Sequence, residues 1–231
     1  MTFVFAPAAQ PAVPVLGSTE LFPVHRIYCV GKNYAAHIRE MGADLREPPC
    51  FFLKPADAVV LNGRMPYPPG TQNLHYEGEL VIALGAGGAN ITTSKALDHI
   101  FGYAAGLDMT RRDLQVAAGN RGQPWDTGKA FDHSAPLTAI HPVVKTGKAL
   151  KGTLQLRVNG VLKQDTDLAD MIWDCAGIIS ELSKLYTLQA GDLIFTGTPA
   201  GVGAVVAGDR IELKITGLTA LNVEIVKGNI V

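Results

Sequence analysis

Three carboxylates placed in otherwise apolar segments constrain this chain more than any other feature. Glu77 and Glu79 open the segment Glu-Gly-Glu-Leu-Val-Ile-Ala-Leu, and Asp108 follows the apolar run 100–107. Both segments have the composition of buried strands, where a carboxylate without a partner costs several kcal/mol. A divalent metal ion would neutralise such acids. We therefore expect the chain to fold around a metal site.

Strand alternation places two of these acids together. Alternate residues of a strand share a face, so Glu77 and Glu79 point the same way in a strand over 77–84. Glu-x-Glu is also common on solvated strand faces, and the apolar residues that continue this strand favour the metal site instead. Because the ligands are oxygens without a His/Cys set, Mg²⁺ or Mn²⁺ is favoured over Zn²⁺.

The composition indicates one compact domain that acts on a small molecule. Of 231 residues, 47% are hydrophobic and 18% charged, which suffices for a sizeable core. A net charge of −1 without a Lys/Arg run argues against nucleic acid or an anionic membrane as a partner. Three scattered cysteines predict reduced thiols, and the N-terminus lacks the basic start of a secretory signal. We expect a cytoplasmic protein.

The order of elements predicts an α+β fold that is predominantly β. Residues 1–24, rich in Pro and Ala, predict an extended arm or short hairpin, and the catalytic domain is expected over 25–231. A short helix is expected over 33–42 and the main core helix over 168–185, with a turn-rich connection at 63–70. The expected strands cover 26–31, 48–55, 77–84, 100–107, 154–158, 161–164, 191–195 and 208–215.

Two turns carry further information. Asn159-Gly160 lies between two apolar runs, which predicts a hairpin with a type I′ turn. The glycine-rich segment 196–203 lacks the Gly-Lys-Ser/Thr ending of a phosphate loop and opens no expected helix. It suits a backbone-lined pocket wall better than a nucleotide site.

A His-x-x-Glu pair is a candidate general base. His37 and Glu40 are three residues apart on an expected helix, so the carboxylate can hold the imidazole and raise its basicity. The same spacing is also typical of an exposed surface pair. Lys54 and Lys129 are single cations that could meet a substrate anion or a developing oxyanion, although lysines at strand ends commonly extend into solvent.

Two polar residues follow Asp108 at helical spacing. Arg112 and Gln115 are three residues apart, and 110–113 has the pattern of a helix start. Both side chains can therefore point at a ligand held by the metal, or simply be solvated on the helix surface.

Several segments, taken together and in this order, resemble the fumarylacetoacetate hydrolase family. They are 31–40, 52–55, 75–80, 107–115, Lys129 and 196–203. The resemblance runs from about residue 26 to the C-terminus and is strongest to the short acylpyruvate hydrolases. It implies a mixed β-roll fold, a homodimer, and Mg²⁺ or Mn²⁺ bound by Glu77, Glu79 and Asp108.

The resemblance also implies roles for the other candidate residues. His37 and Glu40 match the catalytic dyad, on a lid that orders over bound substrate, and Lys129 matches a third catalytic residue. The matching substrate-binding residues are Lys32, Arg112, Gln115 and Thr198. Lys32 stands where many relatives carry Arg, and Tyr76 and Gly78 vary the surroundings of the metal glutamates, so the choice of substrate stays open.

The implied reaction is hydrolysis of the carbon–carbon bond of a 2,4-dioxo acid, with fumarylpyruvate, cleaved to fumarate and pyruvate in the catabolism of aromatic compounds, as the main expectation. The same metal-held enolate would also serve an oxaloacetate decarboxylase or an isomerase of an unsaturated dioic acid. A further alternative, of another class, is a non-catalytic protein that binds a small diacid.

Overall fold

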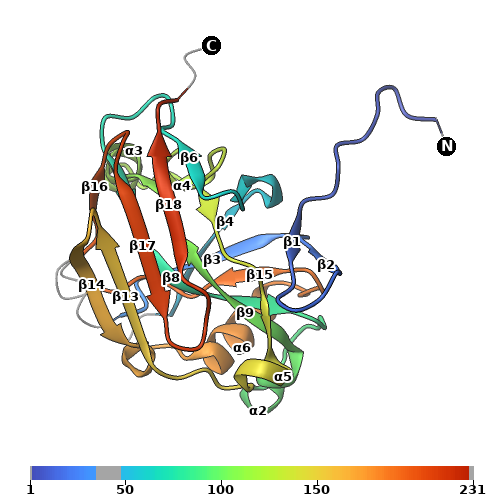
Figure 1. Ribbon diagram of the computed structural model, residues 1–231. Coiled ribbons are helices and arrows are strands. Elements are labelled where there is room, and N and C mark those ends of the chain that lie inside the picture. Colours follow the sequence, from blue (N-terminus) through green and yellow to red (C-terminus); the bar gives the residue numbers. More distant parts are fainter. Residues whose placement is uncertain (1, 35–47, 229–231) are drawn as a thin grey trace.

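A six-stranded and a five-stranded mixed sheet form the body of the protein, as the computed structural model shows for residues 2–34 and 48–228 (Figure 1). In spatial order, the larger sheet contains β12 (His141–Pro142), β9 (Ile100–Leu107), β8 (Gly78–Leu84), β15 (Leu193–Phe195), β3 (Ile27–Gly31) and β4 (Cys50–Lys54). The smaller contains β14 (Val161–Asp167), β13 (Thr153–Val158), β17 (Arg210–Ile215), β18 (Leu221–Val226) and β6 (Arg64–Pro66).

Shorter strands and a few helices complete the fold. The remaining strand groups are β10 (Thr110–Arg111) with β7 (Leu74–Tyr76) and β16 (Gly203–Val205), β1 (Ala12–Pro14) with β2 (Leu21–Pro23), and β11 (Ala135–Pro136) with β5 (Val59–Val60). The α-helices are α2 (Thr93–Ala96), α3 (Arg112–Asn120), α4 (Asp126–Lys129), α5 (Val143–Thr146) and α6 (Cys175–Leu185). Short 3₁₀ turns cover Ala56–Ala58, Leu97–His99 and Leu168–Asp170. The predominantly β fold with mixed sheets confirms the expectation from the sequence.

The helices are distributed over two ends of the molecule. In Figure 1, α3 and α4 lie near one end of the sheets, whereas α2, α5 and α6 lie near the other. Among the described residues, no helix is both long and apolar enough to cross a bilayer.

Strand β8 is buried along its whole length because both of its faces are covered. Leu80 and Ile82 belong to the core between the two sheets, which also contains Leu156 of β13. Val81 points into a second core, where it packs with Val13 of the β1–β2 hairpin. This explains the unbroken apolar run of β8, and it confirms the predicted alternation of its faces.

The two sheets approach each other closely at Gly78. A Cβ atom added there would lie 2.9 Å from Leu156 Cδ1 and 3.0 Å from Leu213 Cδ1, closer than packed carbons allow. The Gly78 N–H donates to Gln164 Oε1 of β14 at 2.9 Å, which connects the larger sheet to the smaller one. Gly78 stands between Glu77 and Glu79, so the contact between the sheets fixes the backbone of both acids.

The helix expected over 168–185 is wrong in its first third, because α6 begins at Cys175. The Trp173 N–H donates to the side chain of Asn33 at 2.8 Å, and this long-range bond replaces a helical one. The Asp174 side chain then accepts a hydrogen bond from the first turn of α6 at 2.7 Å and acts as its N-cap.

Other expectations were met to differing degrees. Asn159 and Gly160 have φ angles of 50° and 81°, as the predicted type I′ turn between β13 and β14 requires. The connection expected at 63–70 contains the short strand β6, which pairs with β18 in parallel. The helix expected over 33–42 falls largely outside the described residues.

Replacing Gly78 with alanine should lower the free energy of unfolding by about 1–3 kcal/mol, because the added methyl group displaces the buried ends of the Leu156 and Leu213 side chains. Urea denaturation of the metal-free protein measures this change. An unchanged midpoint would contradict the close packing at this position.

Candidate metal centre and substrate cavity

A single cavity of about 430 Å³ brings most of the predicted site residues together. Strands β3, β4, β7 and β8, helices α3 and α4, and the loop after β15 contribute to its walls. The predicted residues in it are Lys32, Glu77, Glu79, Asp108, Arg112, Gln115, Lys129 and Thr198. His37 and Glu40 lie outside the described residues.

Strand pairing brings the three acids together. Gly78 and Leu107 pair across β8 and β9, so the residue before β8 lies beside the residue after β9. The Asp108 N–H accordingly donates to the Glu77 carbonyl at 2.9 Å. Glu77 lies between β7 and β8 rather than inside one strand, yet it faces the same side as Glu79, as predicted.

The acid cluster of Glu77, Glu79 and Asp108 is a metal site by its chemistry. One carboxylate oxygen from each residue lies within 4.8 Å of the other two, and the residues are 5%, 1% and 1% exposed. Hard divalent cations such as Mg²⁺ and Mn²⁺ take oxygen ligands of this kind. The donor set therefore fits the metal that the sequence suggested.

Lys129 neutralises two of the acids. From the end of α4, its Nζ donates to Glu77 Oε2, Asp108 Oδ2 and Thr110 Oγ1, each at 2.7 Å. Burial alone would lower the pKa of Lys129, but Asp108 and Glu77 raise it above its ordinary value. The ammonium group thus stays charged inside the protein, with all three of its protons bonded.

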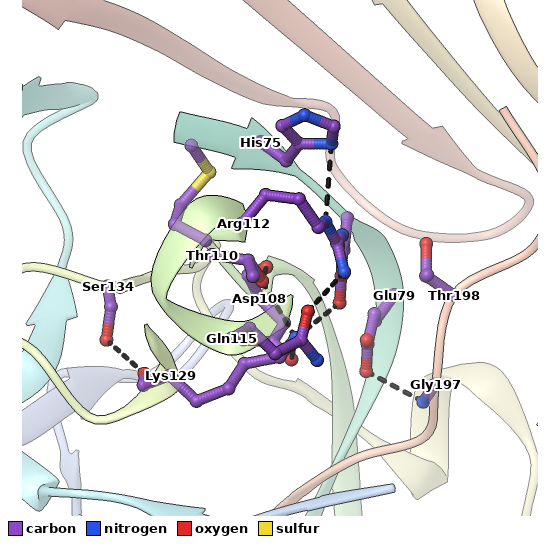
Figure 2. A network of polar contacts seen from close by, with 12 residues as sticks. His75, Glu79, Asp108, Thr110, Arg112, Gln115, Lys129, Ser134, Gly197 and Thr198 are labelled. Carbon is purple, nitrogen blue, oxygen red and sulfur yellow. Dashed lines mark hydrogen bonds and ion pairs between the residues drawn. The ribbon is translucent and has the colours of Figure 1, made fainter. Parts of the chain in front are cut away.

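Arg112 connects the acid cluster to α3. Its guanidinium group donates to Glu77 Oε1. It also donates to Gln115 Oε1, as Figure 2 shows. The bond to Oε1 orients the Gln115 amide, whose NH₂ group is left for a ligand in the cavity. Burial tends to raise the pKa of Glu77, but Lys129 and Arg112 lower it to about 2, so this carboxylate is ionised at neutral pH.

Unlike Glu77 and Asp108, Glu79 forms no ion pair within the part of the chain that the structure describes. Its Oε2 accepts a hydrogen bond from the Gly197 N–H at 2.7 Å, in the loop after β15 (Figure 2). Burial, together with the neighbouring Asp108 and Glu77 charges, raises the pKa of Glu79 well above its ordinary value. A metal ion supplies the positive charge that this carboxylate lacks.

Two further residues, Lys54 and His75, support the cluster. Lys54 Nζ lies 2.8 Å from Asp108 Oδ1 and donates to the Met109 carbonyl, so it fixes the acid from β4. His75 Nδ1 lies 3.5 Å from Arg112 Nε, and burial together with Arg112 lowers its pKa to about 4. Its neutral ring therefore accepts from Arg112 at physiological pH.

Not all of these contacts were anticipated from the sequence. From the sequence, Lys54 is expected to meet a substrate anion, whereas in the structure its ammonium group contacts the Asp108 carboxylate. His75 was not identified, although strand alternation from Glu77 and Glu79 would have placed it on the same side. The contact of Gly197 with Glu79 joins residues 118 positions apart, which no local pattern reveals.

Lys32 lies at another wall of the cavity in a strained conformation. Its φ of 60° is in the left-handed region, which is unfavourable for a residue with a Cβ. Among the described residues its ammonium group has no partner.

The chain matches the family model of the fumarylacetoacetate (FAA) hydrolase C-terminal domain over residues 26–226. It is 45% identical to the fumarylpyruvate hydrolase of a Ralstonia species, over 76% of this chain and 91% of that protein. It is also 42% identical to the mitochondrial oxaloacetate tautomerase of Homo sapiens, over 87% of this chain and 91% of that protein.

A solved structure has nearly the same fold. It is the fumarylpyruvate hydrolase of Pseudomonas aeruginosa in complex with Mn²⁺ and pyruvate, with a TM-score of 0.96 and 49% identity. The match covers 98% of this chain and all of that one. The mixed β-roll expected from the sequence is therefore confirmed.

The raised pKa of Glu79 predicts that metal binding depends on pH. Below that pKa the carboxyl is protonated and must release its proton to bind Mn²⁺, so affinity should rise with pH by up to about tenfold per unit. Titration calorimetry in buffers of different ionisation enthalpy counts the released protons. The Glu79→Gln variant should bind more weakly and release none, whereas pH-independent binding by the wild type would contradict the assignment.

Proposed function

Because the chain belongs to the fumarylacetoacetate hydrolase family, we propose that it hydrolyses the carbon–carbon bond of a 2,4-dioxo acid, with fumarylpyruvate as the preferred substrate. The observation that carries this proposal is a buried Glu-Glu-Asp cluster beside Lys129 and Gln115 in one cavity. The relative from Pseudomonas aeruginosa, bound to Mn²⁺ and pyruvate, supports both the metal and the product.

Glu77, Glu79 and Asp108 would hold the divalent ion, which supplies Lewis-acid stabilisation to the pyruvate part of the substrate. Beside them, the NH₂ group of Gln115 can donate to a substrate oxygen on which negative charge develops, and the positive charge of Lys129 stabilises that negative charge without a free donor. Arg112 fixes the Gln115 amide relative to the acid cluster because it donates to both Glu77 and Gln115.

His37, oriented by Glu40, is proposed as the general base on the strength of the family resemblance. It removes a proton from water, whose oxygen adds to the C4 carbonyl carbon. The C3–C4 bond then breaks, its electron pair forms the enolate of pyruvate, and a proton completes that product. Fumarylpyruvate and one water thus give fumarate and pyruvate.

Oxaloacetate tautomerase is the second candidate activity, favoured by the human relative at 42% identity. Tautomerisation needs enolate stabilisation and proton transfer but no attack by water. Release of fumarate and pyruvate, measured against enol–keto exchange of oxaloacetate, separates the two activities.

Two further parts of the proposal, a homodimer and a role in the catabolism of aromatic compounds, rest on the resemblance alone. A cytoplasmic location is proposed from the three scattered cysteines, which predict reduced thiols. The proposed division into an arm over 1–24 and a catalytic domain over 25–231 is supported by the family match, which begins at residue 26.

Replacing His37 with alanine should lower kcat for fumarylpyruvate by about 10²–10⁴-fold, because the general base is lost. The dissociation constant for Mn²⁺ should change little, since His37 is no ligand in this scheme. Replacing Glu79 with glutamine should lower kcat and also weaken the binding of Mn²⁺, because Glu79 is a metal ligand in this scheme. This variant is therefore the matched comparison for His37→Ala. Stopped-flow absorbance and calorimetry give the two quantities, and wild-type turnover by His37→Ala with metal present would refute the mechanism.

A further inference from the structure

One face of α3 lines the cavity along the entire helix. The lining residues recur at intervals of three and four, as one helical face requires. They are Arg112, Gln115, Val116, Gly119 and Asn120. Arg112 contacts the acid cluster, and Gly119 lies two turns farther on, about 10 Å along the helix axis. The outer part of this face therefore borders whatever extends away from the metal.

Two aromatic side chains, Phe52 and Trp125, form a second wall of the cavity, which also begins beside the acid cluster. Lys129 Nζ lies 5.0 Å from the centre of the Phe52 ring, and Phe52 meets Trp125 at 5.9 Å between ring centres, edge to face. Trp125, which is half-buried, lines the cavity and approaches Gly119. Helix α3 and the aromatic wall thus meet beyond the acid cluster.

Within residues 2–34 and 48–228, no contact requires glycine at position 119. Its φ is not in the left-handed region, and an added Cβ would meet only Trp125 Nε1, at an ordinary distance of 3.6 Å. Glycine also destabilises a helix relative to alanine. Gly119 therefore weakens the helix without serving the packing of the described residues, and its missing side chain leaves open the part of the cavity that it lines together with Trp125.

We propose that the part of the cavity lined by Gly119 and Trp125 is the acyl subsite, and that Gly119 determines specificity by admitting flat acyl groups longer than acetyl. This inference rests on the proposed function, which puts the pyruvate part on the metal. A conjugated acyl group such as fumaryl would lie against the indole ring. The Trp125 Nε1–H has no acceptor among the described residues and can donate to the far end of the acyl group.

The test compares kcat/KM for fumarylpyruvate and acetylpyruvate in the Mn²⁺-loaded protein. Gly119→Leu should lower the value for fumarylpyruvate at least tenfold more than that for acetylpyruvate, because the leucine fills the subsite. Gly119→Ala should shift the ratio in the same direction by less, while raising the melting temperature by about 1–3 °C. Ala117→Leu, which adds bulk to the same helix outside the cavity, should leave the ratio as it is.

The outcomes separate this inference from the proposed function. If Gly119→Leu lowered kcat/KM equally for both substrates, or lowered it for neither, the acyl subsite would be overturned. The proposed hydrolase activity would be unaffected by that result. A wild type that cleaves neither substrate would overturn the hydrolase. In that event, calorimetry would measure the dissociation constants of fumarylpyruvate and acetylpyruvate instead. If Gly119→Leu left the ratio of these two constants unchanged, the subsite would be overturned as well.

Discussion

The structure depends on the balance of charge around three buried carboxylates. Glu77, Glu79 and Asp108 lie where β8 begins and β9 ends, and removing them from water is costly. Lys129, Lys54 and Arg112 approach from three separate elements and neutralise two of the acids. Glu79 accepts a hydrogen bond from a backbone N–H, and a metal ion would balance its charge. The contacts that hold these elements together are therefore also the contacts that prepare the site.

Local patterns in the sequence predicted whatever depends on neighbours along the chain. The alternation of faces in β8 followed from strand geometry, which places successive side chains on opposite faces. Glu79 is the one charged residue in this fully buried strand. The turn at Asn159-Gly160 followed from its backbone preference. The start of α6 did not, because Asn33 binds the backbone at Trp173, and no helical pattern contains a partner 140 residues away.

The candidate site was predictable in its members but not in its bonds. The order of motifs identified Glu77, Asp108 and Lys129, and the cavity contains all three. That Lys129 bonds to both acids, and that Gly197 bonds to Glu79, depends on how strands pair and loops close. Such contacts follow from the tertiary arrangement, which residue types alone leave undetermined. The catalytic roles of His37 and Glu40 stay a prediction that is based on the family resemblance.

Helix α3 has a consequence for how such a protein can diversify. Only Ala118 of this helix is buried, whereas every residue of β8 is. Residues at the outer turns of α3 can therefore be exchanged without disturbing the core that holds the acids. A lineage built on this scaffold could acquire new substrates through a few helix-surface changes, while its reaction chemistry stayed protected inside the sheets.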